Sequence, residues 1–268
     1  ILNDVRKNGD SAVKKYERKF NGRKTSQLRV SEKEIKEAQS KISRKEVTAL
    51  RDMSVHLLHR RKILAIAERV ENRASVYRYF VPIPSVGCYI PGGQARYPSS
   101  VVMSVVPARQ AGVKRIVVVS PPGRDGKIDP LTIAAAKMCG ATEIYKVGGA
   151  QAIAALAYGT KSIPKVDKIV GPGGKFVSIA KSFVSDQTAI DMVAGPTELG
   201  IIADASSNPE LVALDLISQA EHSKDTMCFV ITQSKTTAKQ IQKSIEKLIP
   251  GTERSSIIKE SISKNGFI

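Results

Sequence analysis

The sequence has few cysteines and lacks the long apolar runs that would anchor a chain in a membrane. Its 268 residues include only three cysteines, Cys88, Cys139 and Cys228, which are far apart and form no CxxC pair. This spacing argues against a disulfide framework and fits a reducing compartment, so we expect a cytoplasmic location. No apolar run approaches the roughly 18 residues that a membrane-spanning helix needs. No apolar block follows the charged Arg6–Lys7 pair, so neither a signal peptide nor a membrane partner is expected.

Motifs for common chemistries are also missing. The sequence contains neither GxGxxG nor GxxxxGK[ST], the two strongest nucleotide-binding signatures. It has three histidines, two of which, His56 and His59, lie three residues apart in a basic helical segment. This pair has two interpretations, metal ligands or surface side chains. Because no acidic or cysteine partner is close by, the surface interpretation is favoured.

Acidic residues are scarce. The chain has 42 Lys and Arg against 25 Asp and Glu, a net charge of +17, which raises nucleic acid as a partner. The excess lies mainly in residues 1–75, with 20 basic and 10 acidic side chains, whereas residues 76–228 have 15 and 12. Few aromatic side chains accompany these charges, only Tyr16 and Phe20 with Tyr77 just beyond, so stacking on bases has little support. Nucleic acid is therefore not expected, and the charges are interpreted as a solvated face.

The remaining composition is that of a folded chain. Apolar residues make up 42 % and charged residues 25 %, which excludes wholesale disorder, and the length suits about two domains. Residues 1–75 are predicted to be helical, with capping-box pairs at Ser31 and Glu34 and at Ser43 and Glu46. Ile1 is not a methionine, and the chain stops at Ile268 without a cap or tail. We therefore expect a fragment.

From about Val76, short apolar runs alternate with helical patterns. The predicted strands are 86–90, 115–120, 143–147 and 168–170, and the predicted helices are 99–111, 130–139, 150–158 and 175–184. This alternation is typical of parallel βαβ units. A second α/β stretch begins near Ala194, with strands at 199–203 and 227–232 and helices at 208–222 and 236–248.

Glycine-led turns follow three of the predicted strands, at 91–93, 148–149 and 171–174. Helix N-termini at the carboxyl ends of parallel strands bind anions. The turns are therefore either anion-binding loops or ordinary tight turns. Gln151 lies just inside one of these helix starts, where its amide either reaches a ligand or caps the turn.

Gln219 and His222 are three residues apart near the end of a predicted helix and share one face. They could supply two metal ligands from one rigid element. Alternatively, His222 is favoured there by the helix macrodipole alone. Spacing does not separate the two interpretations.

Six blocks become informative as a set. They occur in order as CYIPGG (88–93), YPSS (97–100), VGGAQAIAALA (147–157), VDKIVGPG (166–173), DMVAGPTE (191–198) and SQAEH (218–222). With the similar opening stretch 4–16, the chain resembles the histidinol dehydrogenase family over essentially its whole length. This family contains the zinc enzymes that end histidine biosynthesis.

The resemblance implies NAD- and zinc-dependent oxidation of L-histidinol to L-histidine through L-histidinal. Tyr89 and Gln151 match positions that contact NAD, and Gly174 stands where the family has an NAD-contacting Asn. Thr197 matches a substrate-contacting Ser. Gln219 and His222 match two zinc ligands at the substrate site.

The resemblance also implies that the catalytic Glu-His pair, and the remaining zinc ligands, an Asp and a second His, lie beyond Ile268. No catalytic residue is therefore expected within residues 1–268, and the fragment alone is expected to be inactive. In this family the second His comes from the other subunit, which implies a homodimer with a shared active site. Gly174 and the missing segment leave one alternative, a degenerate paralogue with a binding or structural role.

The expected fold is α/β, with two Rossmann-like parallel-sheet domains, an N-terminal helical segment and the C-terminal part missing. We expect residues 1–75 to form a basic helical segment that packs with the second α/β unit. Residues 76–193 are expected to form the first Rossmann-like domain and residues 194–268 part of the second.

Overall fold

The computed structural model describes residues 1–22, 27–71, 81–92, 96–123, 125–193 and 198–268, with the backbone alone at residue 21 and over residues 58–71. Contacts within the chain divide it into two compact units, Ile1–Ala194 and Gly195–Ile268. Each unit is built on its own parallel sheet.

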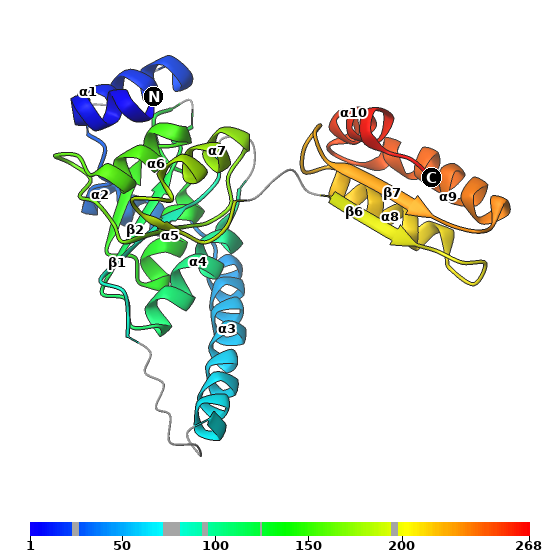
Figure 1. Cartoon of the computed structure of the whole chain (residues 1–268), viewed down its shortest axis with the longest axis horizontal. Helices are drawn as coiled ribbons and strands as arrows, with labels where there is room; N and C mark the ends of the chain where they lie inside the picture. Colours follow the sequence, from blue (N-terminus) through cyan, green and yellow to red (C-terminus); the bar gives the residue numbers. More distant parts are fainter. Residues whose placement is uncertain (23–26, 72–80, 93–95, 124, 194–197) are drawn as a thin grey trace. The chain divides into compact units, whose positions relative to one another are not determined.

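A five-stranded parallel sheet forms the centre of the first unit (Figure 1). Its strands are β1 (Ser85–Tyr89), β2 (Arg115–Ser120), β3 (Glu143–Lys146), β4 (Lys168–Val170) and β5 (Ala189–Ile190). Their order is β3-β2-β1-β4-β5, and Cys88 of β1 lies between Val118 of β2 and Val170 of β4. The order reverses at β1. Open α/β sheets bind ligands at such a switch point, outside the carboxyl ends of the strands.

Helices cover both faces of this sheet (Figure 1). They are α4 (Pro98–Gln110), α5 (Pro130–Cys139), α6 (Gly149–Tyr158) and α7 (Lys175–Val184). Alternate residues of β1 point to opposite faces, so Cys88 is buried with α4 and α5, and Tyr89 is buried with α6 and α7. The result is a doubly wound sheet with a core on each side.

The N-terminal helices form an outer layer on the same unit (Figure 1). The helices α1 (Leu2–Asn21), α2 (Glu32–Ser40) and α3 (Arg44–Glu71) pack on α6, α5 and α4, respectively. Their apolar residues join the cores of the first sheet: Val13 of α1 is buried with α6, and Leu50 of α3 with α4. The packing of residues 1–75 with the second α/β unit stays a prediction.

The predicted capping boxes are present. The Ser31 side chain accepts a hydrogen bond from the backbone of Glu34 (3.2 Å), and the Glu34 carboxylate accepts one from the backbone of Ser31 (2.8 Å). The same reciprocal pair joins Ser43 and Glu46. Each box satisfies donors that a helix N-terminus leaves unpaired.

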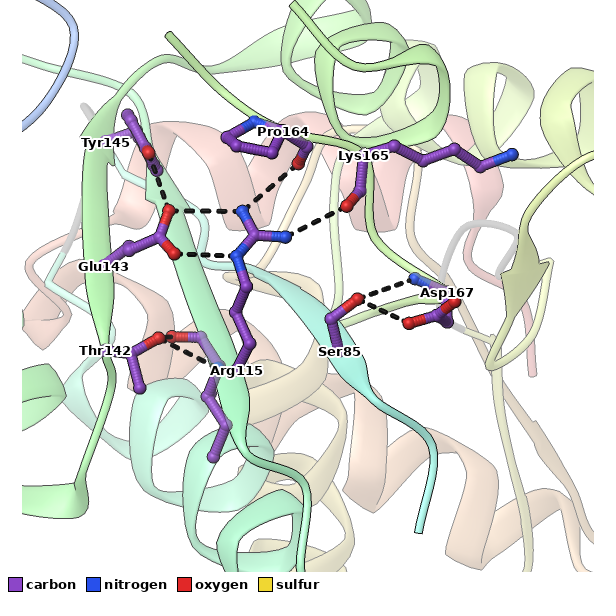
Figure 2. A network of polar contacts seen from close by, with 9 residues as sticks. Ser85, Arg115, Thr142, Glu143, Tyr145, Pro164, Lys165 and Asp167 are labelled. Atoms are coloured by element: carbon purple, nitrogen blue, oxygen red, sulfur yellow. Dashed lines mark hydrogen bonds and ion pairs between the residues drawn. The ribbon is translucent and has the colours of Figure 1, made fainter.

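A polar network closes the amino-terminal edge of the first sheet (Figure 2). Arg115 makes a two-point contact with Glu143, at 2.7 Å from Nε and 3.2 Å from Nη2, and its Nη1 donates to the carbonyl of Lys165 at 2.9 Å. Tyr145 donates to the same carboxylate at 2.7 Å. These contacts tie β2 and β3 to the segment that enters β4, opposite the carboxyl ends of the strands.

The second unit pairs β6 (Glu198–Ile202) with β7 (Met227–Ile231) in parallel. Its helical elements are α8 (Pro209–Ala220), α9 (Lys235–Leu248), the short 3-10 turn η1 (Ile249–Gly251) and α10 (Ser255–Asn265). Its core joins Leu216 of α8, Val230 of β7, Ile241 of α9 and Ile258 of α10. The opposite side of the sheet leaves Ile202 and Ile231 exposed.

The α/β prediction with parallel sheets is confirmed. The strand β5 and the helix α10 were not predicted. Among the described residues, none of the helices combines the length and the apolar character needed to cross a membrane. Cys88, Cys139 and Cys228 are all free and buried.

Candidate functional site

The turn after β4 requires glycine. Gly171 has φ +108°, and a Cβ there would lie 2.2 Å from the carbonyl oxygen of Tyr89. At Gly173, a Cβ would lie 2.3 Å from the side chain of Val177. The close approach of β1 and β4 at their carboxyl ends therefore depends on Gly171, and the packing of the turn against Val177 depends on Gly173.

An ion pair between a buried lysine and an exposed carboxylate holds this turn in place. Lys181 of α7, which is 3 % exposed, pairs with Asp191 and donates to the carbonyl of Gly171 at 3.1 Å. Asp191 in turn accepts from the backbone N–H of Gly171 at 2.8 Å. Burial raises the pKa of Asp191, but the hydrogen bonds from Lys181 and from backbone N–H groups outweigh it and lower the pKa. The carboxylate thus stays charged and braces the turn.

Gly174 occupies the N-cap position of α7 and is exposed. A Cβ at Gly174 would meet no heavy atom within 4 Å, and Lys175, the first residue of the helix, is exposed as well. The helix N-terminus at this turn is therefore open to a ligand, and the backbone has room for a side chain at position 174.

Tyr89 and Gln151 meet at the first turn of α6. The Tyr89 hydroxyl accepts a hydrogen bond from the backbone N–H of Gly149 at 3.1 Å, and Gln151 lies two residues further along the same helix. Both side chains are buried. The structure thus brings together two of the three residues that the resemblance assigns to NAD, at the carboxyl ends of β1 and β3.

Glu17 of α1 is the residue at this place that sequence reasoning missed. Its side chain is fully buried, and its Oε1 accepts from the backbone N–H of Gly148 at 3.0 Å and from Nε2 of Gln151 at 2.8 Å. The N-terminus of α6 therefore already holds an anion from its own chain. No local pattern marks Glu17 as buried, because its partners lie 131 and 134 residues away in the sequence.

A hollow of about 370 Å³ opens beside the ends of β1 and β2. Its lining includes Gly92 and Ser120, the basic side chains Arg96 and Lys127, and the acidic side chain Asp129. Arg96 pairs with Asp129 at 3.0 Å. The predicted turn at 91–93 borders this hollow, although its Gly93 lies outside the described residues.

In the second unit, Gln219 lies in the last turn of α8, and His222 follows in a turn because the helix ends at Ala220, two residues earlier than predicted. His222 is exposed and Gln219 is half-buried. The ring Nδ1 of His222 is 3.0 Å from the carbonyl oxygen of Ser218. Because a carbonyl only accepts, Nδ1 carries the hydrogen, and Nε2 of the neutral ring keeps a lone pair for a metal. The same contact caps a helix carbonyl, so the macrodipole interpretation fits it too.

Three further residues were singled out from the sequence, Thr197, His56 and His59. Thr197, the predicted substrate contact, and the side chain of His59 lie outside the described residues. His56 is exposed. Within the described part of the chain, no three His, Cys, Asp or Glu side chains gather as a metal site.

The comparisons with known proteins bear on the whole chain. The family model described as histidinol dehydrogenase matches residues 1–268. The chain belongs to the histidinol dehydrogenase family. The histidinol dehydrogenase of Bacillus cereus (strain ATCC 10987) is 46 % identical over 274 residues, and that of Methanocaldococcus jannaschii is 43 % identical over 272 residues. Each alignment covers 100 % of this chain and 63 % of the relative.

A solved structure agrees with this membership. The crystal structure of histidinol dehydrogenase from Elizabethkingia anophelis matches with a TM-score of 0.85 and 33 % identity, over 100 % of this chain and 63 % of that chain. The chain thus spans about 63 % of the length of these histidinol dehydrogenases.

Proposed function

We propose that this chain belongs to an enzyme that oxidises L-histidinol to L-histidine through L-histidinal, with NAD as oxidant and zinc at the substrate site. The observation that carries the proposal is the position of Tyr89 at the switch point of a doubly wound sheet, where its hydroxyl contacts the first turn of α6, which contains Gln151. Family membership supplies the substrate class.

The reaction balances as two successive two-electron oxidations. The alcohol loses a hydride and a proton to become the aldehyde. The aldehyde then adds water and loses a second hydride to become the acid. In total, one histidinol, two NAD⁺ and one water give one histidine carboxylate, two NADH and three protons.

The residues of the first unit contribute binding and orientation. NAD, when bound, supplies the hydride acceptor, and the protein positions it. Tyr89 and Gln151 would contact it beside α6, and the open N-terminus of α7 at Gly174 would face it. The Lys181–Asp191 pair keeps the turn before α7 in the shape that admits the cofactor.

The donor set of the second unit fits part of a zinc sphere. Nε2 of His222 and the amide oxygen of Gln219 are suitable ligands, three residues apart where α8 ends at Ala220. Zinc, when bound, holds the imidazole and the amine of the substrate. Since a zinc site in this class takes more than two ligands, we propose that the others, with the Glu-His pair for proton transfer, come from sequence outside residues 1–268. One of them would come from the partner of a homodimer.

Three free buried cysteines support a cytoplasmic location for the enzyme.

The test is an assay of the full-length protein. We expect two NADH per histidinol consumed, loss of activity after metal removal with a chelator, and recovery with zinc. A zinc-loaded dimer that binds NAD without oxidising histidinol would contradict the proposal and favour a degenerate paralogue.

His222→Ala separates the two interpretations of this histidine. As a ligand, His222 would be needed for zinc, so metal analysis of the purified full-length variant should show at least a tenfold weaker zinc affinity. The matched control is His56→Ala, which removes an exposed histidine from α3 and should leave the zinc content unchanged. Equal zinc content in both variants would restore the helix-capping interpretation.

A further inference from the structure

The amide of Gln151 has a fixed orientation, and a residue from a distant helix fixes it. Nε2 of Gln151 lies 2.8 Å from Oε1 of Glu17, and the same oxygen accepts from the backbone N–H of Gly148 at 3.0 Å. A carboxylate without a proton can only accept hydrogen bonds. The nitrogen of the amide must therefore face Glu17, and the amide oxygen must face away from it.

Within the described part of the chain, Oε1 of Gln151 is left without a hydrogen-bond donor. Gln151 is 2 % exposed, and its Oε1 is a buried atom that has no hydrogen-bond partner among the described residues. Buried polar atoms are nearly always paired, because an unpaired one forfeits its hydration. A Cβ at Gly149 would lie 2.9 Å from this oxygen, so a larger residue at position 149 would crowd it.

We propose that Glu17 is a positioning residue for the dinucleotide site, which turns the Gln151 amide so that its oxygen accepts a hydrogen bond from the cofactor. The inference rests on the proposed function for the identity of the ligand. It adds a chemical restriction: the group that meets Gln151 is a hydrogen-bond donor, a hydroxyl or an N–H of NAD. A phosphate oxygen could not serve, because it would meet an acceptor.

The neighbouring phenol is influenced by the same carboxylate. Burial, with a smaller contribution from the negative charge of Glu17, raises the pKa of Tyr89. Tyr89 therefore stays protonated at neutral pH. Glu17 thus acts on both side chains predicted to contact NAD. It does so from α1, which packs on α6.

The first test compares Glu17→Leu with Glu17→Gln in the full-length enzyme. Leucine removes the acceptor and frees the Gln151 amide to turn, so the KM for NAD should rise about tenfold while kcat and the KM for histidinol change less than twofold. Glutamine keeps an acceptor oxygen for both donors, so the KM for NAD should stay within about threefold of wild type.

The control is Val13→Ala. Val13 is buried on the same helix against α6, so this variant loosens the packing of α1 without touching the amide. We expect Val13→Ala to lower the melting temperature as Glu17→Leu does, but to leave the KM for NAD unchanged. An equal rise of KM in both variants would mean that Glu17 acts only through packing, and would overturn the proposal.

A second substitution tests the direction of the hydrogen bond. Gln151→Glu removes the amide donor to Glu17 and places two carboxylates face to face, so the KM for NAD should rise at least tenfold. An unchanged KM for NAD in a folded Gln151→Glu variant would show that the donated hydrogen bond is not needed, and would overturn the proposal.

Direct NAD titration of the wild-type enzyme separates the two levels of the argument. Wild-type protein that fails to bind NAD or to oxidise histidinol contradicts the proposed function itself. Wild-type protein that does both, with unaltered NAD affinity in Glu17→Leu, contradicts only the role of Glu17.

Discussion

Individual glycines around the switch point have different physical roles. Gly171 is required by its positive φ and by the carbonyl of Tyr89 behind it, whereas Gly174 has an ordinary φ of −68° and open space around its Cα. The resemblance places an Asn of the family at position 174, and Asn is among the preferred residues at a helix N-cap. Position 174 therefore lacks a side chain that the backbone would accept.

Gly174→Asn should stabilise the protein slightly and improve cofactor binding. The N-cap side chain should add about 0.3 kcal/mol to the free energy of unfolding, and the KM for NAD should fall. Urea unfolding and steady-state kinetics of the full-length enzyme measure the two effects.

Gly171→Ala is the matched control within the same turn. Its φ of +108° and the 2.2 Å approach to the Tyr89 carbonyl leave no room for a Cβ. It should lose roughly 2 kcal/mol or more of stability. If Gly174→Asn destabilises the protein as much as Gly171→Ala, the N-cap geometry described for Gly174 is contradicted.

Among the elements, the first sheet has two chemically different edges. Its carboxyl edge has glycine turns, an open N-terminus at α7, and Tyr89 bonded to the first turn of α6, which contains Gln151. Its amino edge is closed by Arg115 and Glu143, whose side chains are 25 % and 15 % exposed (Figure 2). We interpret the amino edge as structural, because its charged groups satisfy one another and the carbonyls of the segment that enters β4.

Arg115→Met should lower the free energy of unfolding by about 1–2 kcal/mol, because it leaves the Glu143 carboxylate half-buried without its cation. The KM for NAD should not change, since the substitution lies at the opposite edge. Lys137→Met is the control: it removes an exposed pair with Glu32 at 3.8 Å and should cost less than about 0.5 kcal/mol.

The loss of unfolding free energy in Arg115→Met should depend on pH. Burial raises the pKa of Glu143, but hydrogen bonds from Arg115 and Tyr145 outweigh it, so the pKa in the folded protein lies below the value of 4.5 for a free side chain. The stabilisation is therefore complete above about pH 4.5 and is lost as the pH falls through the lower pKa of the folded state. Urea unfolding at pH 7 and below pH 4 should show a smaller difference between wild type and variant in acid. A constant difference would contradict the ion pair as the cause.

For the whole molecule, the distribution of the cores is the main feature. The two clusters around the first sheet consist of residues up to Val184, and the third cluster consists of residues from Leu199 onward. The basic N-terminal helices belong to the first unit and complete its outer layer. Most of the basic residues of the chain therefore belong to the unit that has the predicted NAD contacts.

A fragment of residues 1–193 should fold by itself, because the described residues of its two cores all come from the first unit. We expect a single cooperative thermal transition by circular dichroism. The matched comparison removes residues 1–27 from this fragment and should strongly lower the midpoint temperature of the transition. The reason is that α1 covers α6 and supplies Val5, Val13 and the buried Glu17. A non-cooperative melt of the 1–193 fragment would contradict the independence of its cores.

Local patterns predicted most of the elements and failed where the signal was short or uncapped. The alternation of apolar runs and helical patterns over residues 86–184 predicted β1 to β4 and α4 to α7, because period and turn residues are local properties. The strand β5 has two residues, too few to show a period. The helix α10 begins after Arg254 without a side-chain cap, so no start signal marked it.

The sequence by itself determined the family, the α/β alternation and the candidate positions Tyr89, Gln151, Gly174, Thr197, Gln219 and His222. These follow from motifs and periods that are readable along the chain. Only the tertiary structure decided that α1 packs on the first sheet, and that Glu17 meets Gln151 across 134 residues of sequence. The physical reason is that burial and hydrogen-bond direction depend on which helix covers which face, and contacts between residues far apart in the chain decide that.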